Sequence, residues 1–424
     1  MKGIYLSIMI IISRIENVLL SAGKEVMKHV DKNRKPLFIF SLLAALACSP
    51  QIVHHSGDYI INKNEPIWET PKNAVEYGYR DSRYIRRIWP KKEPAVITAV
   101  GDVALNFATM KEILDSRARK HGRKSAMTYP FSKVSHEITG IGFCNLEAPV
   151  TDRNFKPFSD KDEVFYFSSP AGSEDILRYA GFDIASLANN HIKDCGEEGM
   201  FETAERIEKL NIAPVGIGKN IDEALKPVFM WHRGTRVAFF AFNNVVPKSV
   251  WAGPERAGAA SGSDELMVAA VKKVRGEVDA IVVSIHWGQE VTSDIPVAKP
   301  EAEQVALGHK LIDAGASCIL GHQSHGLGPV ELYKNGIIFY SLGDFVFAGR
   351  HSSAHRTSML ARVTLSEKGL ESYTLIPVNI NPLEVHYSPE ILSERGGAQV
   401  INRVLYAKDS RYSDYYEQKE LALK

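Results

Sequence analysis

The chain has 424 residues, enough for two average domains or for one large α/β domain with appendages. Its 51 lysines and arginines nearly balance 50 aspartates and glutamates, which gives a formal charge of +1. This balance argues against the strong positive field of nucleic-acid-binding proteins, so no nucleic-acid partner is expected. The local basic stretch from Arg80 to Lys92 has two interpretations, a solvated linker or a polyanion site, and we favour the linker.

Residues 1–48 have the composition of a secretory leader. Positive charges between Lys28 and Lys35 precede an apolar run that is short for a membrane span. The run ends in Ala45-Leu-Ala-Cys48, which resembles a bacterial lipobox, in which the cysteine becomes the lipidated first residue. Ala45 stands where leucine is usual. We therefore expect lipidation at Cys48 and a membrane-anchored protein of the cell envelope, outside the cytoplasm.

Two alternatives concern where this leader begins. Met27 lies at a suitable distance to be the true start, which would make residues 1–26 an upstream extension. The other alternative is an uncleaved amino-terminal anchor that includes Ile4–Ile12.

A change of character at residue 95 predicts the start of the main domain. Residues 49–94 are polar and lack sustained periodicity, which favours a tether followed by a segment packed on an edge. From 95 to 385, apolar strands alternate with helical patterns, which is typical of an α/β sheet domain. Residues 386–424 are expected to form a helix and a charged tail.

The expected strands of this domain begin with three apolar runs, each followed by polar residues. Further strands and helices follow in alternation, and the last two strands are expected to be partly antiparallel. The expected strands are 95–101, 138–144, 182–188, 213–218, 237–242, 280–285, 316–320, 336–342, 359–365 and 372–378; the expected helices follow Asp102, span about 199–210 and 301–314, and lie near 389–406.

Five of the expected strands end directly in a carboxylate, an amide or an imidazole. These ends carry Asp102, Glu147, Asn190 with His191, His286, and His322 with His325. Polar groups of this kind are costly to bury without partners, so five in series predict one shared polar site at the carboxyl edge of the sheet. His309, His351 and His355 lack such a position and are expected to be solvated.

Mixed oxygen and nitrogen donors suit zinc, manganese or iron and do not suit calcium. One or two such ions would lower the pKa of a bound water and clamp the oxygens of a transferred group. An adjacent histidine would then protonate the leaving group. Asp102 has a second interpretation as a helix cap, which does not exclude its being a ligand.

Seven motifs follow one another along the domain: Val100-Gly-Asp102, Asn145-Leu-Glu147, Ser186-Leu-Ala-Asn-Asn-His191 with Asp194 and Gly196, Val283-Ser-Ile-His-Trp-Gly288, Leu311-Ile-Asp-Ala-Gly315, Gly321-His-x-x-His325, and Tyr340-Ser-Leu-Gly-Asp-Phe-Val-Phe347. In this order they resemble the motifs of the CapA-type poly-γ-glutamate capsule biosynthesis family. The resemblance runs from about residue 95 to 378. That family is similar in turn to the calcineurin-like metallophosphoesterases.

The resemblance implies a four-layer α/β sandwich, in which two mixed β-sheets are flanked by helices. It also implies a set of metal ligands and an acid, His191, which Asp194 would hold in place. The implied metal ligands are Asp102, Glu147, Asn190, His286, His322 and His325.

Three positions depart from the family patterns. Ala104 stands where metallophosphoesterases usually have a histidine, so that one metal position is weak, vacant or completed by another group. Gln323-Ser324 stand where His-Pro is usual, and Asp344 stands where asparagine is commoner. Asp344 is either an extra acidic ligand or a turn residue, and we favour the turn.

Three functions remain open at this stage, and the last of them is a task in the cell envelope that is unrelated to a capsule. The first is a metal-dependent hydrolase that acts on an anionic surface polymer or a phosphoester. The second is a non-catalytic subunit that binds the polymer within a capsule synthesis or export complex, which the alanine at position 104 favours.

Overall fold

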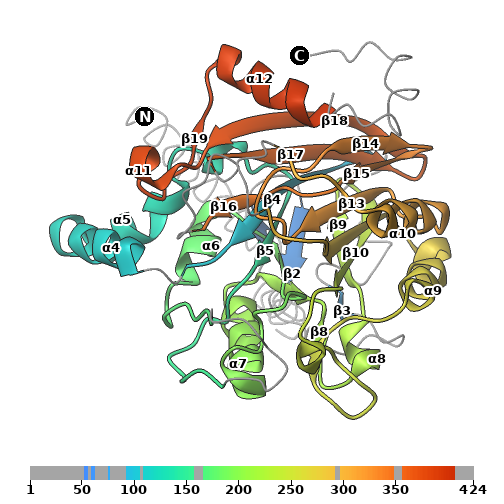
Figure 1. The fold of residues 1–424 in the computed structure, drawn as a ribbon, viewed down its shortest axis with the longest axis horizontal. Helices are drawn as coiled ribbons and strands as arrows, with labels where there is room; N and C mark the ends of the chain where they lie inside the picture. Colours follow the sequence, from blue (N-terminus) through green and yellow to red (C-terminus); the bar gives the residue numbers. More distant parts are fainter. Residues whose placement is uncertain are drawn as a thin grey trace, which may run out of the picture. The chain divides into compact units, whose positions relative to one another are not determined.

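The computed structural model describes residues 92–105, 108–156, 166–291, 297–347 and 356–405, together with the backbone of three short strands between 52 and 76. Two mixed β-sheets form the centre of this region (Figure 1). One has seven strands and the other has eight. Together with the surrounding helices they confirm the predicted α/β fold with two sheets.

Four parallel strands form the middle of the seven-stranded sheet, with antiparallel β14 and β9 beside them. β12 is buried along its whole length, which explains its continuous apolar run, since such strands are covered on both faces. The neighbours in order are β14 (Val330–Tyr333), β15 (Gly336–Phe339), β13 (Cys318–His322), β12 (Ala280–His286), β10 (Thr235–Asn243), β9 (Val228–His232) and β3 (Val75–Glu76).

The eight-stranded sheet also has a parallel half and an antiparallel half. A short strand, β16 (Asp344–Val346), pairs in parallel with β4 beside the main order. That order is β19 (Glu390–Ile391), β18 (Gly369–Asn379), β17 (Thr357–Ser366), β4 (Ala95–Val103), β5 (Ile141–Leu146), β6 (Ile184–Ser186) and β7 (Ala213–Val215). Two further pairs are β1 (Ile52–His55) with β2 (Tyr59–Asn62) and β8 (Ile217–Gly218) with β11 (Gly258–Ala259).

The two sheets pack face to face through large apolar side chains. Phe143 of β5 stacks on Phe239 of β10, with ring centroids 6.2 Å apart. Both rings are fully buried in one core cluster. This packing brings the strand ends of the two sheets close to one another.

Helices cover the outer faces of both sheets. Met267 of α9 (Asp264–Val274) and Leu307 of α10 (Ala302–Asp313) share a core cluster with Phe240 and Ile281 of the seven-stranded sheet. On the other sheet, a Cβ at Gly142 would lie 2.5 Å from the carbonyl oxygen of Gly181, the residue after α6 (Asp175–Ala180). The remaining α-helices are α4 (Ala108–His121), α5 (Arg123–Thr128), α7 (Gly196–Lys209), α8 (Ile221–Ala224), α11 (Pro382–Val385) and α12 (Glu394–Leu405).

The order of strands and helices agrees with the alternation that the sequence predicts. Elements that the sequence pattern does not predict include β9, β14, β16 and α9. Within the part of the chain that the structure describes, no helix is both long and apolar enough to cross a membrane. Cys48 and the leader lie outside the described residues, and the proposed domain division stays a prediction.

Candidate metal centre

Polar side chains from both sheets meet at the carboxyl ends of the parallel strands. In the eight-stranded sheet, Asp102 of β4 is in register with Asn145 of β5, and Glu147 follows β5 directly. In the seven-stranded sheet, His286 of β12 is in register with His322 of β13. All five side chains are buried.

Two glycines allow neighbouring backbone to approach these strand ends. A Cβ at Gly101 would lie 1.9 Å from the carbonyl oxygen of Gly343, and one at Gly321 would lie 2.1 Å from that of Tyr340. Any larger residue at either position would push the adjacent chain away. The glycines that precede Asp102 and His322 in the motifs are therefore required by packing around the site.

Asp102 is held by three donors. Its Oδ1 lies 2.8 Å from His322 Nδ1 and accepts a hydrogen bond from Asn145 Nδ2 at 2.9 Å. Its Oδ2 accepts from the backbone N–H of Gln323 at 3.3 Å. Because Nδ1 of His322 is directed at Asp102, Nε2 is the nitrogen that remains for binding a metal ion. This Nε2 is buried without a hydrogen-bond partner. A carboxylate that orients a ligating imidazole in this way is common around metal ions.

Glu147 is the least satisfied charged group of the site. Both of its carboxylate oxygens are buried without a hydrogen-bond partner, and Oε1 lies 3.4 Å from His286 Nε2. A buried carboxylate in this situation is costly unless another charge compensates it. A bound cation would provide that compensation.

His286 lies between two asparagine side chains. Asn145 Nδ2 is 3.4 Å from His286 Nδ1, and Asn190 Oδ1 is 3.0 Å from His286 Nε2. Because an amide Nδ2 can only donate, this arrangement favours the tautomer that carries its proton on Nε2. The Nδ2 of Asn190 has no hydrogen-bond partner. Asn189 supports this arrangement by donating to Asn145 Oδ1 at 3.2 Å.

The turn after β13 directs a second histidine into the site. Gln323 and His325 both have a positive φ, 90° and 59°. Residues other than glycine adopt such a backbone conformation at a cost of about 1–3 kcal/mol each. His325 Nδ1 lies 2.7 Å from Asp344 Oδ1, and its Nε2 lies 3.7 Å from Glu290 Oε1. The strained turn thus places a second imidazole beside two acidic side chains.

Asp344 is not the turn residue that we favoured from the sequence. It belongs to β16, pairs in register with Asp102, and is buried. Its carboxylate contacts His325 through the hydrogen bond above, so it positions that imidazole. The local sequence Gly-Asp-Phe suggests a turn. The pairing with β4, which makes Asp344 part of a strand, is a long-range contact that a local pattern does not indicate.

His191 and Asp194 form a separate pair beside the strand ends. His191 Nδ1 lies 2.7 Å from Asp194 Oδ2, which also accepts the backbone N–H of Phe167 at 2.7 Å. The imidazole stacks on the ring of Phe167, with centroids 4.0 Å apart. This arrangement fixes the ring plane of His191 and holds its Nδ1 against a carboxylate.

The buried groups shift one another's protonation. Burial raises the pKa of Asp102, but the charge of His322 and its hydrogen bond outweigh this, so that the net pKa lies below its usual value. Burial, together with the charge of Asp102, raises the pKa of Glu147 well above its usual value. Burial lowers the pKa of His286 to about 4. Burial also lowers the pKa of His325, but the charges of Asp344 and Glu147 raise it by more, well above its usual value.

Asp102, Glu147 and His325 form the three-residue cluster of the site. Each offers one donor atom, and these atoms lie within 4.8 Å of one another. His322 Nε2 and both Glu147 oxygens are buried without hydrogen-bond partners. Two carboxylates and imidazole nitrogens suit a divalent transition metal, so the residues present fit such an ion.

Ala104 fills the position where a further histidine ligand was considered. It is fully buried and packs with Ala148 and Phe347 in a small apolar cluster, against which Phe167 also lies. The ring of Phe347 also lies 5.0 Å from that of His325. Apolar side chains therefore occupy this side of the site, and no donor replaces the histidine there among these residues.

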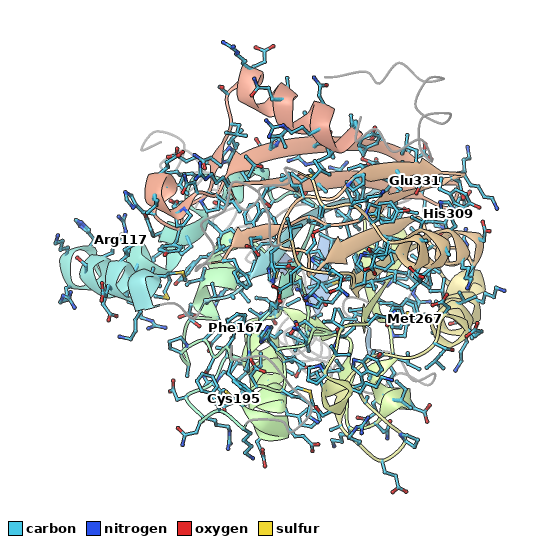
Figure 2. All side chains as sticks on the ribbon, viewed as in Figure 1. Arg117, Phe167, Cys195, Met267, His309 and Glu331 are labelled. Atoms are coloured by element: carbon cyan, nitrogen blue, oxygen red, sulfur yellow. The ribbon has the colours of Figure 1, made fainter. Side chains whose placement is uncertain are left out.

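Sequence reasoning missed several residues of the site. The polar end of the expected strand indicates Glu147, whereas the role of Asn145 depends on contacts with Asp102 and His286 that no local pattern indicates. Glu290 follows the His-Trp-Gly motif on a loop with no local signal. His309, expected to be solvated, is partly exposed; its ring stacks on that of Tyr333 with centroids 3.8 Å apart, and its Nε2 lies 2.9 Å from Glu331 Oε1 (Figure 2). His351 and His355 lie outside the described residues.

The model of the family described as bacterial capsule synthesis protein PGA_cap matches residues 96–349. The chain belongs to this family. The match spans the strand ends that build the site, from β4 to β16, so the site lies in the part of the chain that defines family membership.

Curated relatives agree with this assignment. The chain is 30% identical to the capsule biosynthesis protein CapA of Bacillus anthracis over 68% of each chain. It is 29% identical to the PGA biosynthesis protein CapA of Bacillus subtilis, over 69% of this chain and 76% of that protein. A probable polyglutamine synthesis accessory protein of Mycobacterium tuberculosis is 28% identical over 64% of this chain and 77% of its own length.

Solved structures with similar folds include two nucleotidases. The NAD nucleotidase of Haemophilus influenzae aligns with a TM-score of 0.38 and 11% identity, over 77% of this chain and 60% of its own. A 5'-nucleotidase precursor from Thermus thermophilus aligns with a TM-score of 0.39 and 13% identity, over 73% of this chain and 57% of its own. Similarity at this level does not identify a shared activity.

Proposed function

We propose that this chain is a metal-dependent hydrolase that acts on a phosphoester or amide bond during synthesis of a capsule polymer of the poly-γ-glutamate type. The observation that carries the proposal is the three-residue cluster, in which Glu147 is buried without a hydrogen-bond partner for either oxygen. Membership in a capsule synthesis family supports the polymer context.

The proposed ligands are Asp102, Glu147, His322 and His325, with Asn190 and His286 beside them. A divalent ion of zinc, manganese or iron held there, singly or as a pair, would supply Lewis-acid activation of water and stabilise developing negative charge. Asn145 orients Asp102 and His286 through its amide. The His191–Asp194 pair would move a proton at His191 Nε2.

Metal analysis of the purified chain tests this proposal directly. The wild type is expected to retain a stoichiometric transition metal, and the double variant His286→Ala with His322→Ala is expected to lose it. His309→Ala is the matched control, because this histidine contacts Glu331 away from the site (Figure 2). A metal-free wild type, or a double variant that keeps its metal, would contradict the proposed centre.

Activity assays separate hydrolysis from binding. We expect turnover of a phosphodiester or peptide substrate with added manganese or zinc, and loss of turnover in His191→Ala with the metal retained. His191 contacts Asp194 and Phe167 rather than the three-residue cluster in the contacts described above. Absence of turnover across both substrate classes would refute the enzymatic part of the proposal.

A non-catalytic role in polymer binding is the second candidate. Ala104 and Phe347 make one side of the site apolar, where a metallophosphoesterase would have a histidine ligand. Retained polymer binding in a protein that stays inactive with every added metal would select this role over hydrolysis.

The proposed location is the outer face of a membrane, with a lipid attached to Cys48. The support is the lipobox-like Ala45-Leu-Ala-Cys48 and its preceding apolar run. Labelling of the expressed chain with a fatty acid is expected to depend on Cys48, and Cys48→Ser that remains labelled would contradict this assignment. Capsule synthesis or export subunits are the expected protein partners.

A further inference from the structure

Helices α4 and α5 carry an unusual concentration of positive charge. We call the cations of residues 117–124 the basic projection: Arg117, Arg119, Lys120, Arg123 and Lys124, next to His121. Residues 108–124 contain six lysines and arginines and two acids, a formal charge of +4, whereas the complete chain carries +1. In Figure 1 these helices lie at the left edge of the view, and Figure 2 labels Arg117 there.

Most of these cations are available to a partner. Arg119, Lys120 and Lys124 are exposed, and none of them forms an ion pair within the described part of the chain. Arg123 is already engaged, donating to Asp175 at 3.0 Å and to the carbonyl oxygen of Gly172 at 2.8 Å. Arg117 lies over the ring of Tyr129, 4.1 Å from its centroid. Arg119, Lys120 and Lys124 are therefore solvated, whereas Arg117 and Arg123 are held by contacts within the protein.

An ordinary solvated helix mixes both signs of charge along its exposed face. Here the two acids, Glu112 and Asp115, precede the cations, and Asp115 already pairs with Lys111 at 2.7 Å. From residue 117 to 124 no acidic residue occurs. This separation of charge favours a polyanionic partner over simple solvation.

The surroundings of the basic projection favour a soluble polymer over a membrane. Helices that lie in a membrane interface expose large apolar side chains beside their cations. The apolar residues of α4, such as Met110 and Leu114, are buried instead. The exposed large hydrophobic residues of the described chain all lie outside residues 108–128.

The chain connects the basic projection to the candidate metal centre at two points. Helix α4 begins six residues after Asp102, and its 14 residues span about 20 Å. Arg123 binds Gly172 and Asp175, which follow the segment where Phe167 stacks on His191. A ligand that contacts both places must therefore be long.

We propose that the basic projection binds an extended polycarboxylate chain and holds it beside the candidate metal centre. The choice of polymer rests on the proposed function, because relatives are named for capsule and PGA biosynthesis. Repeated carboxylates match the spaced cations Arg119, Lys120 and Lys124 through exposed ion pairs. Each such pair is weak, so binding depends on several of them acting together and weakens with salt.

Binding of labelled poly-γ-glutamate to the full-length chain tests this inference at low salt. The variant is Lys120→Glu with Lys124→Glu, and its expected dissociation constant is about tenfold higher than that of the wild type. The matched control is Lys272→Glu with Lys273→Glu on α9, which changes the net charge equally at two other exposed lysines. The control is expected to bind within about twofold of the wild type.

Three outcomes would overturn the inference. They are absence of binding by the wild type, equal weakening in both variants, and tighter binding of wild type to RNA or to phosphatidylglycerol vesicles than to the polymer. Metal content and turnover of a small substrate are measured in the same variants and are expected to match the wild type. Failure of the hydrolase proposal would appear in those two measurements, whereas failure of this inference would appear in polymer binding alone.

Discussion

Asp344 Oδ1 lies 2.7 Å from His325 Nδ1, and both side chains are buried. The pairing of β16 with β4 fixes this contact, since Asp344 is in register with Asp102. The same short strand therefore supplies the partner of one imidazole and lies beside a carboxylate of the three-residue cluster.

The first prediction concerns Asp344 as a positioning residue. Asp344→Ala removes the acceptor that orients His325, so metal affinity is expected to fall by about 10- to 100-fold. Asp344→Asn keeps an acceptor oxygen and is expected to lose less. Titration of the metal by calorimetry compares them, with Asp313→Ala as a control at an exposed carboxylate that pairs with Lys334. Equal affinities for the alanine variant and the wild type would exclude this role.

The second prediction separates stability from metal binding at Glu147. Because this buried carboxylate has no hydrogen-bond partner, Glu147→Gln is expected to stabilise the metal-free protein above neutral pH by about 1–3 kcal/mol. The same variant should lose the stabilisation that added metal gives the wild type. Thermal unfolding with and without metal measures both effects. A destabilised metal-free variant would show that Glu147 has a compensating partner.

The third prediction concerns protons released on metal binding. The raised pKa values of Glu147 and His325 mean that both groups retain protons at higher pH than usual. Because ligands must be deprotonated, metal affinity is expected to rise with pH, and metal binding is expected to release protons. Calorimetry in two buffers with different ionisation enthalpies counts them. Heats that do not depend on the buffer would rule out this coupling.

The fourth prediction concerns Glu208 on α7, which is not among the residues of the candidate metal centre. Burial, with a further contribution from the charge of Glu205, raises its pKa from 4.5 to about 7. The folded state therefore binds the proton more tightly than the unfolded state, and stability falls as pH rises from about 4.5 to about 7.

Glu208→Gln removes this pH-dependent loss. The variant should match the wild type below about pH 4.5 and exceed its stability by about 1 kcal/mol above pH 7, after allowance for partial solvent exposure. Urea unfolding across this range measures the difference. Glu205→Gln is the companion variant. It should lower the pKa of Glu208 and so narrow the pH range over which the wild type loses stability. A difference that is constant with pH would contradict the assignment.

The strands that carry the site could be predicted because each is an apolar run that stops at a polar residue. This local pattern located Asp102, His286 and His322 at the ends of β4, β12 and β13. The alternation of strands and helices was also sufficient for the α/β class.

The supporting contacts could not be predicted in the same way. The pairing of Asp344 with Asp102 joins residues far apart in the sequence, so no local pattern indicates β16. Asn145 was missed because its role depends on His286, which comes from the other sheet. Likewise, the packing of Ala104 against Phe347 explains an absent histidine only after both residues are placed in space.

The distance along the chain between Asp102 and His322 has a consequence for folding. The two residues form a 2.8 Å contact across 220 positions, between strands of different sheets. Contacts of such long range form slowly because a large loop must close first. During synthesis, Asp102 therefore lacks its contact with His322 until β13 has emerged. Acquisition of the metal would then mark the completion of folding, and truncated chains that end before β13 would be distinguished by their failure to bind it.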